Sequence, residues 1–189
     1  MKQQKDIDEL LQAAETIARD RNHEYMFTEH VLMAMINNKE FYEVLVDYDV
    51  DLIDFKADLV DYLDTKIAKV EKSPRPMNKT QAVERVFNRS LTQVLFSGRE
   101  SLTLFDIFVS MMSESKTFTS YLCLKHGIKK DEFIDFIKRY HYKKMVDKEE
   151  AAKYDEILAE YCTNLTAEAE IGRIDPVIGR KQELEDLTQ

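Results

Sequence analysis

The sequence predicts an all-α protein built from a duplicated four-helix unit. Glycine and proline, which supply the frequent turns of β folds, are both absent from residues 1–73. Apolar residues recur at helical spacing instead of the alternation typical of strands. The apolar run 31–36 is echoed 76 positions later by the run 107–112. We therefore expect two copies of one helical unit within a domain at residues 1–140, spanning about 5–68 and 80–140.

The first copy opens with two helices. One is expected over about residues 5–21, where apolar positions form a stripe at helical spacing: Leu10, Leu11, Ala14, Ile17 and Ala18. Thr28 is expected to cap the next helix by accepting a backbone N–H, with Glu29 in its first turn. The run 31–36 follows and is apolar all round, which is typical of a helix buried on most of its surface.

The rest of the domain follows the same plan. A short third helix precedes a fourth, for which Asp51 is the expected cap. Residues 69–79 are the predicted link between the copies, because two prolines there favour extended geometry. In the second copy, Thr80 and Thr103 are the expected N-caps of its first and second helices. Two glycines are expected to end helices: Gly98 and, as a left-handed cap, Gly127.

Charge and composition limit the function classes. A formal net charge of −9 and a pI near 5.0 argue against nucleic acid and fit a protein partner with basic groups. No apolar run approaches ~20 residues, so we expect no membrane span. The N-terminus has no signal-peptide core, and Cys123 and Cys162 fit reduced thiols, so we expect a cytoplasmic protein.

Recognisable catalytic and metal motifs are missing from the sequence. His23 and His30 are seven positions apart across a predicted helix start, whereas the zinc-protease motif needs a spacing of four on one helix. We expect an exposed or capping His23, a hydrogen-bonded structural His30, and no metal site. There is no glycine-rich phosphate loop, and no histidine is placed to activate a cysteine. Five methionines are expected to fill the core: Met26, Met33, Met35, Met111 and Met112.

The character of the chain changes after Tyr140. Residues 141–170 are mostly charged and are predicted to form a partly helical linker. Residues 171–189 contain a loop with glycine and proline, followed by the first two turns of an amphipathic helix. We expect this last stretch to be the truncated start of a further domain.

Two segments carry a family resemblance. The string H-E-Y-M-x-x-E-H at residues 23–30 leads into the buried helix, and with the duplicated unit it resembles the N-terminal domain of Clp-type AAA+ unfoldases, most of all their ClpA members. The string I-D-P-V-I-G-R at residues 174–180 is similar to the entry of the first ATPase module in the same proteins. The two signals occur in the family's order, and the first covers about residues 6–140.

The resemblance implies a docking domain on an unfoldase. Such a domain receives substrate proteins and adaptors, which are ClpS-like for the ClpA members, for ATP-driven unfolding and delivery to a ClpP-like peptidase. The implied adaptor-binding residues are Glu24, Tyr25, Glu29, Thr80, Gln81, Glu84 and Arg85. Acids on a rigid helix edge would attract a basic adaptor patch, although each of these residues could equally be an ordinary cap or surface charge. The second helix is rich in methionine where the family is rich in leucine, which leaves the adaptor's identity open.

The implied ATPase chemistry lies beyond Gln189. We therefore expect no catalytic residue, enzymatic activity or cofactor in this chain, with ATP and Mg²⁺ in the full-length protein and a hexamer only through its missing ATPase modules. Val177 and Ile178 resemble residues that pack near the adenine in a complete module. The alternative function is a stand-alone regulator that shares the fold and binds proteins without an ATPase.

Overall fold

The computed structural model describes residues 2–99 and 101–161, with side chains for residues 7–99, 101–144 and 146. The elements of the described part are α1 (Lys2–Asp20), β1 (Tyr25–Met26), α2 (Thr28–Ile36), α3 (Lys39–Asp47), α4 (Leu52–Thr65), β2 (Asn78–Lys79), α5 (Gln81–Phe96), α6 (Leu104–Met112), α7 (Phe118–Lys125) and α8 (Lys130–Tyr161). The chain divides into two units, Met1–Tyr140 and His141–Gln189, and the first holds all the features below. Cys162, Val177 and Ile178 lie outside the described residues.

The duplication predicted from the sequence is confirmed by the helix boundaries. Helices α1–α4 are followed by a second set, α5–α8, and α2 and α6 are both nine residues long with starts and ends 76 positions apart. The left-handed residue that follows α1 is Asn22, and its counterpart 76 positions later is Gly98. The left-handed residue after α3 is Asp49, and its counterpart 78 positions later is Gly127. Equivalent helices therefore end in the same backbone geometry in both copies.

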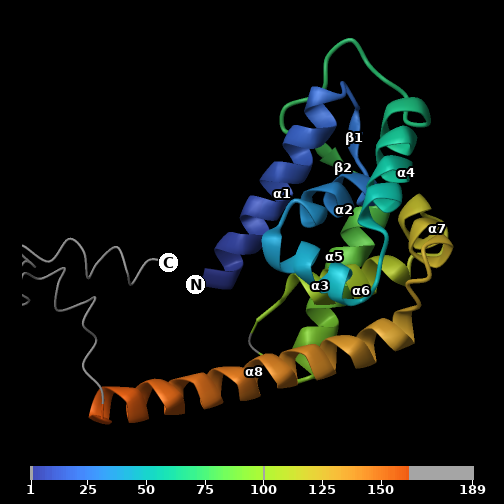
Figure 1. Ribbon diagram of the computed structural model, residues 1–189. Helices are drawn as coiled ribbons and strands as arrows, with labels where there is room; N and C mark the ends of the chain where they lie inside the picture. The colour runs from blue at the N-terminus through green and yellow to red at the C-terminus, as the bar shows by residue number, and fades with distance from the viewer. Residues whose placement is uncertain (1, 100, 162–189) are drawn as a thin grey trace, which may run out of the picture. The chain divides into compact units, whose positions relative to one another are not determined.

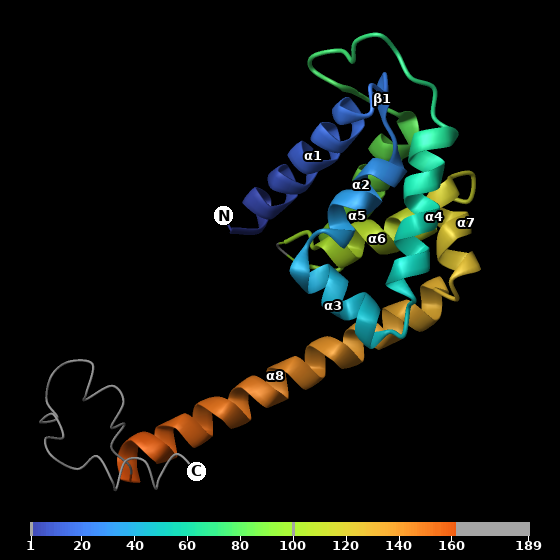
Figure 2. The same cartoon turned by 45° about the horizontal axis from the view of Figure 1, so that its top comes forward.

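Helix α2 lies at the centre of the first unit. All nine of its residues are buried, and it packs against α1, α3, α4, α6 and α7. Figures 1 and 2 both show it between α1 and α4. The prediction of a helix buried on most of its surface is therefore confirmed.

Aromatic side chains join the two copies in one core. The ring of Phe41 on α3 meets that of Phe108 on α6 with centroids 5.0 Å apart, and Phe108 meets Phe133 on α8 at 5.1 Å. All three residues are fully buried. Four of the five methionines expected in the core are buried too, and Met112 packs against the core from a partly buried position. The copies thus share one continuous apolar interior. Separating them would expose this apolar surface to water, so the two copies stabilise each other.

Most of the predicted helix caps are confirmed. Asp51 accepts hydrogen bonds from the backbone N–H groups of α4, and Thr80 and Thr103 accept from those of α5 and α6. The prediction for Thr28 is wrong, because α2 begins at Thr28 and the cap position is Phe27. The Phe27 N–H donates instead to Nδ1 of His30 at 2.9 Å.

The link between the copies contains a strand that the sequence did not predict. β1 and β2 form a two-stranded parallel sheet, in which Tyr25 pairs with Asn78 and Met26 with Lys79. The link is held further by a hydrogen bond of 2.7 Å from the Val70 N–H to the Asn22 carbonyl and by a bridge between His23 and Lys69. Figure 1 shows the two strands beside each other between α1 and α4. The predicted linker therefore returns to residues 22–26, the segment between α1 and α2.

Candidate functional site

The parallel strand pair brings together two segments that are more than 50 residues apart in the chain. Met26 lies opposite Lys79, and the Thr80 N–H donates to the Met26 carbonyl at 3.0 Å. The first turn of α5 therefore starts directly beside the segment that carries Glu24 and Tyr25. We call the resulting exposed surface the junction face and define it as Glu24, Tyr25, Asn78, Lys79, Thr80, Gln81, Glu84 and Arg85.

The junction face is open to solvent. Glu24, Gln81, Glu84 and Arg85 are exposed, Thr80 is partly buried, and the aromatic side chain of Tyr25 is 39% exposed. Six of the seven residues expected to bind an adaptor thus lie in the two segments that the strand pair joins or in the first turns of α5 that follow. The strand pair contributes rigidity, because its hydrogen bonds fix the backbone on both sides of the face.

The charges of the junction face have mixed signs. Glu84 lies in the first turn of α5, where the helix dipole favours a negative group. The Arg85 guanidinium is anchored by Glu114, with Nη2 and Oε1 2.8 Å apart, and Glu114 also pairs with Arg89 at 3.1 Å. Arg85 and then Arg89 hold the pKa of Glu114 below its usual range, despite partial burial. The face therefore carries both positive and negative groups together with an exposed tyrosine.

Glu29 is the one expected docking residue that the structure places elsewhere. It was expected on the surface, but it is only 2% exposed and so cannot contact an adaptor there. Its Oε1 accepts hydrogen bonds from the Thr119 backbone N–H at 2.9 Å and from the Thr119 hydroxyl at 3.2 Å, and Thr28 donates to its Oε2. Glu29 thus supplies the hydrogen-bond acceptor for a backbone N–H in the first turn of α7, in the second copy. No local sequence pattern indicates this contact, because its partner is 90 positions away.

His23 and His30 form a buried neutral pair. His30 Nδ1 accepts from Phe27, so its Nε2 carries the proton and donates to Nδ1 of His23 at 2.7 Å. Burial, then the proximity of His23 and Arg21, lowers the pKa of His30 to about 3, and burial also lowers the pKa of His23. The expectation of an exposed or capping His23 is wrong, because its side chain is fully buried, whereas the structural role of His30 is confirmed.

The described residues do not assemble a candidate metal centre. They contain no cluster of three His, Cys, Asp or Glu side chains arranged around a possible metal ion. Cys123 is buried, and desolvation raises the pKa of its thiol to about 12, so it is not a nucleophile at neutral pH. None of the helices in this part of the chain has the length and apolar character needed to cross a bilayer.

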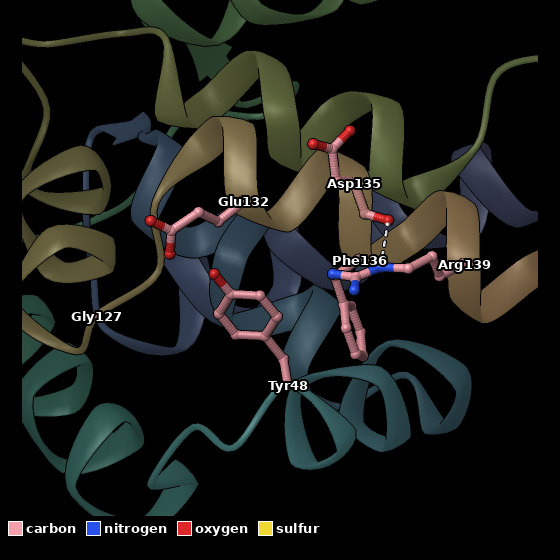
Figure 3. A pocket seen from close by; sticks show the side chains of 6 residues that line it. All are labelled: Tyr48, Gly127, Glu132, Asp135, Phe136 and Arg139. Carbon is pink, nitrogen blue, oxygen red and sulfur yellow. Dashed lines mark hydrogen bonds between the residues drawn. The ribbon is translucent and has the colours of Figure 1, made fainter.

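Two grooves in the described part of the chain lie outside the junction face. One, of about 490 Å³, lies where α8 begins and is lined by Tyr48, Gly127, Glu132, Asp135, Phe136 and Arg139 (Figure 3). Arg139 is tied down there by a hydrogen bond from Nε to the Asp135 carbonyl. The other, of about 770 Å³, runs along α4. Sequence reasoning indicated neither groove, since both depend on how helices pack.

The fold defines a mainly helical domain made of two copies of a four-helix unit, with an exposed face beside the strand pair that joins them. The family description "Clp repeat (R) N-terminal domain" matches residues 3–126, and the chain belongs to this family. It is thus an N-terminal domain of the kind found in Clp ATPases, and the predicted family and fold class are both confirmed.

Known relatives agree with this assignment. The chain is 29% identical over 204 residues to a ClpA homolog protein of Fuscovulum blasticum, and 27% identical over 190 residues to the chaperone protein ClpB of Chlamydia pneumoniae. Each match covers 97% of this chain but only 26% and 21% of the relative, so the chain spans about a quarter of their length.

Solved structures support the fold. The N-terminal domain of Hsp104 from Candida albicans superposes with a TM-score of 0.61 at 12% identity, covering 69% of this chain and 85% of that domain. The N-terminal domain of the caseinolytic protease associated chaperone ClpD from Arabidopsis thaliana gives a TM-score of 0.52 at 13% identity, covering 71% and 91%. At this level of identity the likeness concerns the fold alone.

Proposed function

We propose that this domain docks adaptor and substrate proteins for a ClpA-like ATP-dependent unfoldase, and that the junction face is the adaptor site. One observation carries the proposal: the β1–β2 pairing sets Glu24 and Tyr25 directly beside Thr80 and Gln81 on an exposed surface.

The composition of the junction face suits a protein partner. Exposed tyrosine is enriched at protein interfaces, because its ring buries a large apolar area while its hydroxyl keeps a hydrogen bond. Glu24 and Glu84 are available to basic groups of an adaptor and Lys79 to acidic ones, whereas the Arg85 guanidinium already pairs with Glu114. Mixed charges give specificity and orientation more than raw affinity. A ClpS-like adaptor with the complementary pattern fits this surface.

The whole protein's activity is part of the same proposal. In it, ATP and Mg²⁺ act in ATPase modules that follow this domain, those modules assemble the hexamer, and unfolded substrates pass to a ClpP-like peptidase. The ClpA and ClpB relatives support this extension through their names and greater length. Val177 and Ile178 are proposed to contact the nucleotide only in the complete module.

Adaptor titration tests the docking proposal. We expect a ClpS-like adaptor to bind the 189-residue chain with micromolar or tighter affinity by isothermal titration calorimetry. Glu24→Lys and Lys79→Glu should each weaken binding by about tenfold, since reversing an interface charge replaces attraction by repulsion. Glu132→Lys, which reverses a comparably exposed charge on α8, serves as the control and should leave the affinity unchanged. Equal losses in all three variants, or no binding by the unmodified chain, would contradict the adaptor site.

A further inference from the structure

The groove along α4 combines an apolar floor with an acidic end. Its lining residues are Tyr42 from α3 and Leu52, Ile53, Lys56, Ala57, Val60, Asp61 and Asp64 from α4. Of these, Ile53 is 83% exposed and Tyr42 is 47% exposed. Val46, one helical turn after Tyr42 on α3, is 49% exposed. None of these side chains belongs to the junction face. An exposed apolar strip of this kind on a soluble helix marks an interaction surface more often than scattered single residues do.

The helices that form the groove carry a large excess of acidic over basic side chains. Residues 39–65, which span α3 and α4, contain nine acidic and two basic side chains, a formal charge of −7 against −9 for the whole chain. Asp64 pairs with Arg21 at 2.9 Å, whereas no described cation lies within ion-pair distance of Asp61. Asp58, on another side of α4, is already occupied by Lys125 and His126. The acidic end of the groove therefore retains an unpaired carboxylate beside the apolar strip.

We infer that this groove binds a cationic amphipathic helix of a client protein. The lining positions from Ile53 to Asp64 follow one side of α4 over roughly 17 Å, the length of about three helical turns. A helix laid along it would place apolar side chains against Ile53, Ala57 and Val60 and a lysine or arginine against Asp61. Helix-in-groove docking uses such anchors at helical spacing. Charge complementarity selects basic over acidic helices. The negative electrostatic field around the groove also raises the rate at which a basic helix associates with it.

The inference is tested with a designed probe. A fluorescein-labelled peptide of about 15 residues, with leucines at helical spacing and lysines on the opposite side, is titrated with the 189-residue chain and followed by fluorescence anisotropy. We expect saturable binding that weakens as salt rises from about 0.05 M to 0.5 M, because the attraction is screened. A scrambled peptide of the same composition, and a version with glutamate in place of lysine, should each bind at least about tenfold more weakly.

Paired variants locate the binding. Ile53→Ser and Asp61→Lys should each lower the affinity for the probe by about tenfold, and neither should unfold the chain, since both side chains are exposed. Leu95→Ser on α5, which removes a leucine that is 75% exposed, is the matched control and should have no effect. Equal binding of the acidic peptide, equal loss in Leu95→Ser, or self-association of the chain that Ile53→Ser abolishes would overturn the inference. The Glu24→Lys variant should bind the probe normally, so this test is independent of the adaptor site.

Discussion

The His23–His30 pair gives the domain a specific dependence on pH. The pKa of His30 in the folded chain is lowered from 6.5 to about 3, mainly by burial, so the unfolded chain binds a proton more tightly than the folded one. The stability from the neutral pair is therefore fully present above about pH 7 and is lost as pH falls from about 6.5 toward 3. We expect the free energy of unfolding, from urea titrations, to fall by up to about 1.4 kcal/mol per pH unit in this window.

A substitution separates this effect from ordinary acid denaturation. In His30→Asn the side-chain oxygen can still accept from the Phe27 N–H, but no proton is taken up at this position. The free energy of unfolding should then depend less steeply on pH between pH 7 and pH 5. Its fall below pH 4 should remain, because carboxylates with lowered pKa values, such as Asp106, titrate there. A wild-type stability that is flat between pH 7 and pH 5 would contradict the assigned neutral pair.

Glu29 is predicted to stabilise the fold. Glu29→Ala leaves the buried Thr119 N–H without its acceptor, so we expect a loss of about 1–3 kcal/mol in the free energy of unfolding, measured by urea denaturation. Glu29→Gln keeps an acceptor oxygen and should cost less. Glu24→Ala, on the exposed neighbouring segment, is the control and should change stability by less than about 0.5 kcal/mol. Wild-type stability in Glu29→Ala would show that the contact contributes nothing.

These two sites show what the sequence leaves undetermined at the scale of single residues. Local patterns predicted the caps at Asp51, Thr80 and Thr103, because a cap contacts a backbone N–H two or three positions away. The sequence around Glu29 looks the same as that around an exposed acid in the first turn of a helix. Only its packing against α7, which depends on the whole fold, makes it a buried acceptor.

Helix ends provide a comparison between the two copies at the scale of elements. After α3 the chain turns through Asp49 with φ +68°, and at the equivalent point after α7 it turns through Gly127 with φ +74°. Both ends carry the same closing hydrogen bond: it runs from the Val50 N–H to the Leu45 carbonyl at 3.1 Å after α3, and from the Ile128 N–H to the Cys123 carbonyl at 2.8 Å after α7. A left-handed conformation is strained for aspartate and free for glycine, and a negative charge at a helix C-terminus is unfavourable.

Substitutions at these two positions should change the free energy of unfolding in opposite directions. Asp49→Gly should raise the free energy of unfolding by roughly 1 kcal/mol, and Gly127→Ala should lower it by a similar amount. A Cβ atom on Gly127 would meet nothing within 4 Å, so the cost there is backbone strain and not a clash. Thermal unfolding followed by circular dichroism measures both variants. A decrease for Asp49→Gly would mean that its side chain has a role beyond the turn.

The elements themselves were largely predictable, and the exceptions are instructive. Helical spacing and caps located the helices because both signals are local. β1 and β2 were missed because each has two residues, and they form a sheet only when the link between the copies returns to residues 25–26. No periodicity can develop over two residues, so such a pair is invisible to pattern analysis.

At the scale of the whole molecule, the duplication explains the position of the proposed adaptor site. Neither copy contains the junction face by itself, because Glu24 and Tyr25 come from the first copy and Gln81 and Arg85 from the second. The family resemblance implies these residues without explaining why they lie near each other. The strand pair supplies the physical reason for their proximity. The α4 groove, in contrast, depends on side-chain packing within the first copy and had no counterpart in the sequence patterns.

Mapping by nuclear magnetic resonance tests the central claim most directly. The isotope-labelled 189-residue chain is titrated with an unlabelled ClpS-like adaptor, and backbone amide shifts are followed. We expect the largest changes in residues 24–26 on one segment and 78–85 on the other, with both groups moving at the same adaptor concentration. The amides around Tyr48 and Asp135 in the groove of Figure 3 should not respond. Changes confined to one copy, or centred on a groove away from the strand pair, would contradict the junction face as the docking surface.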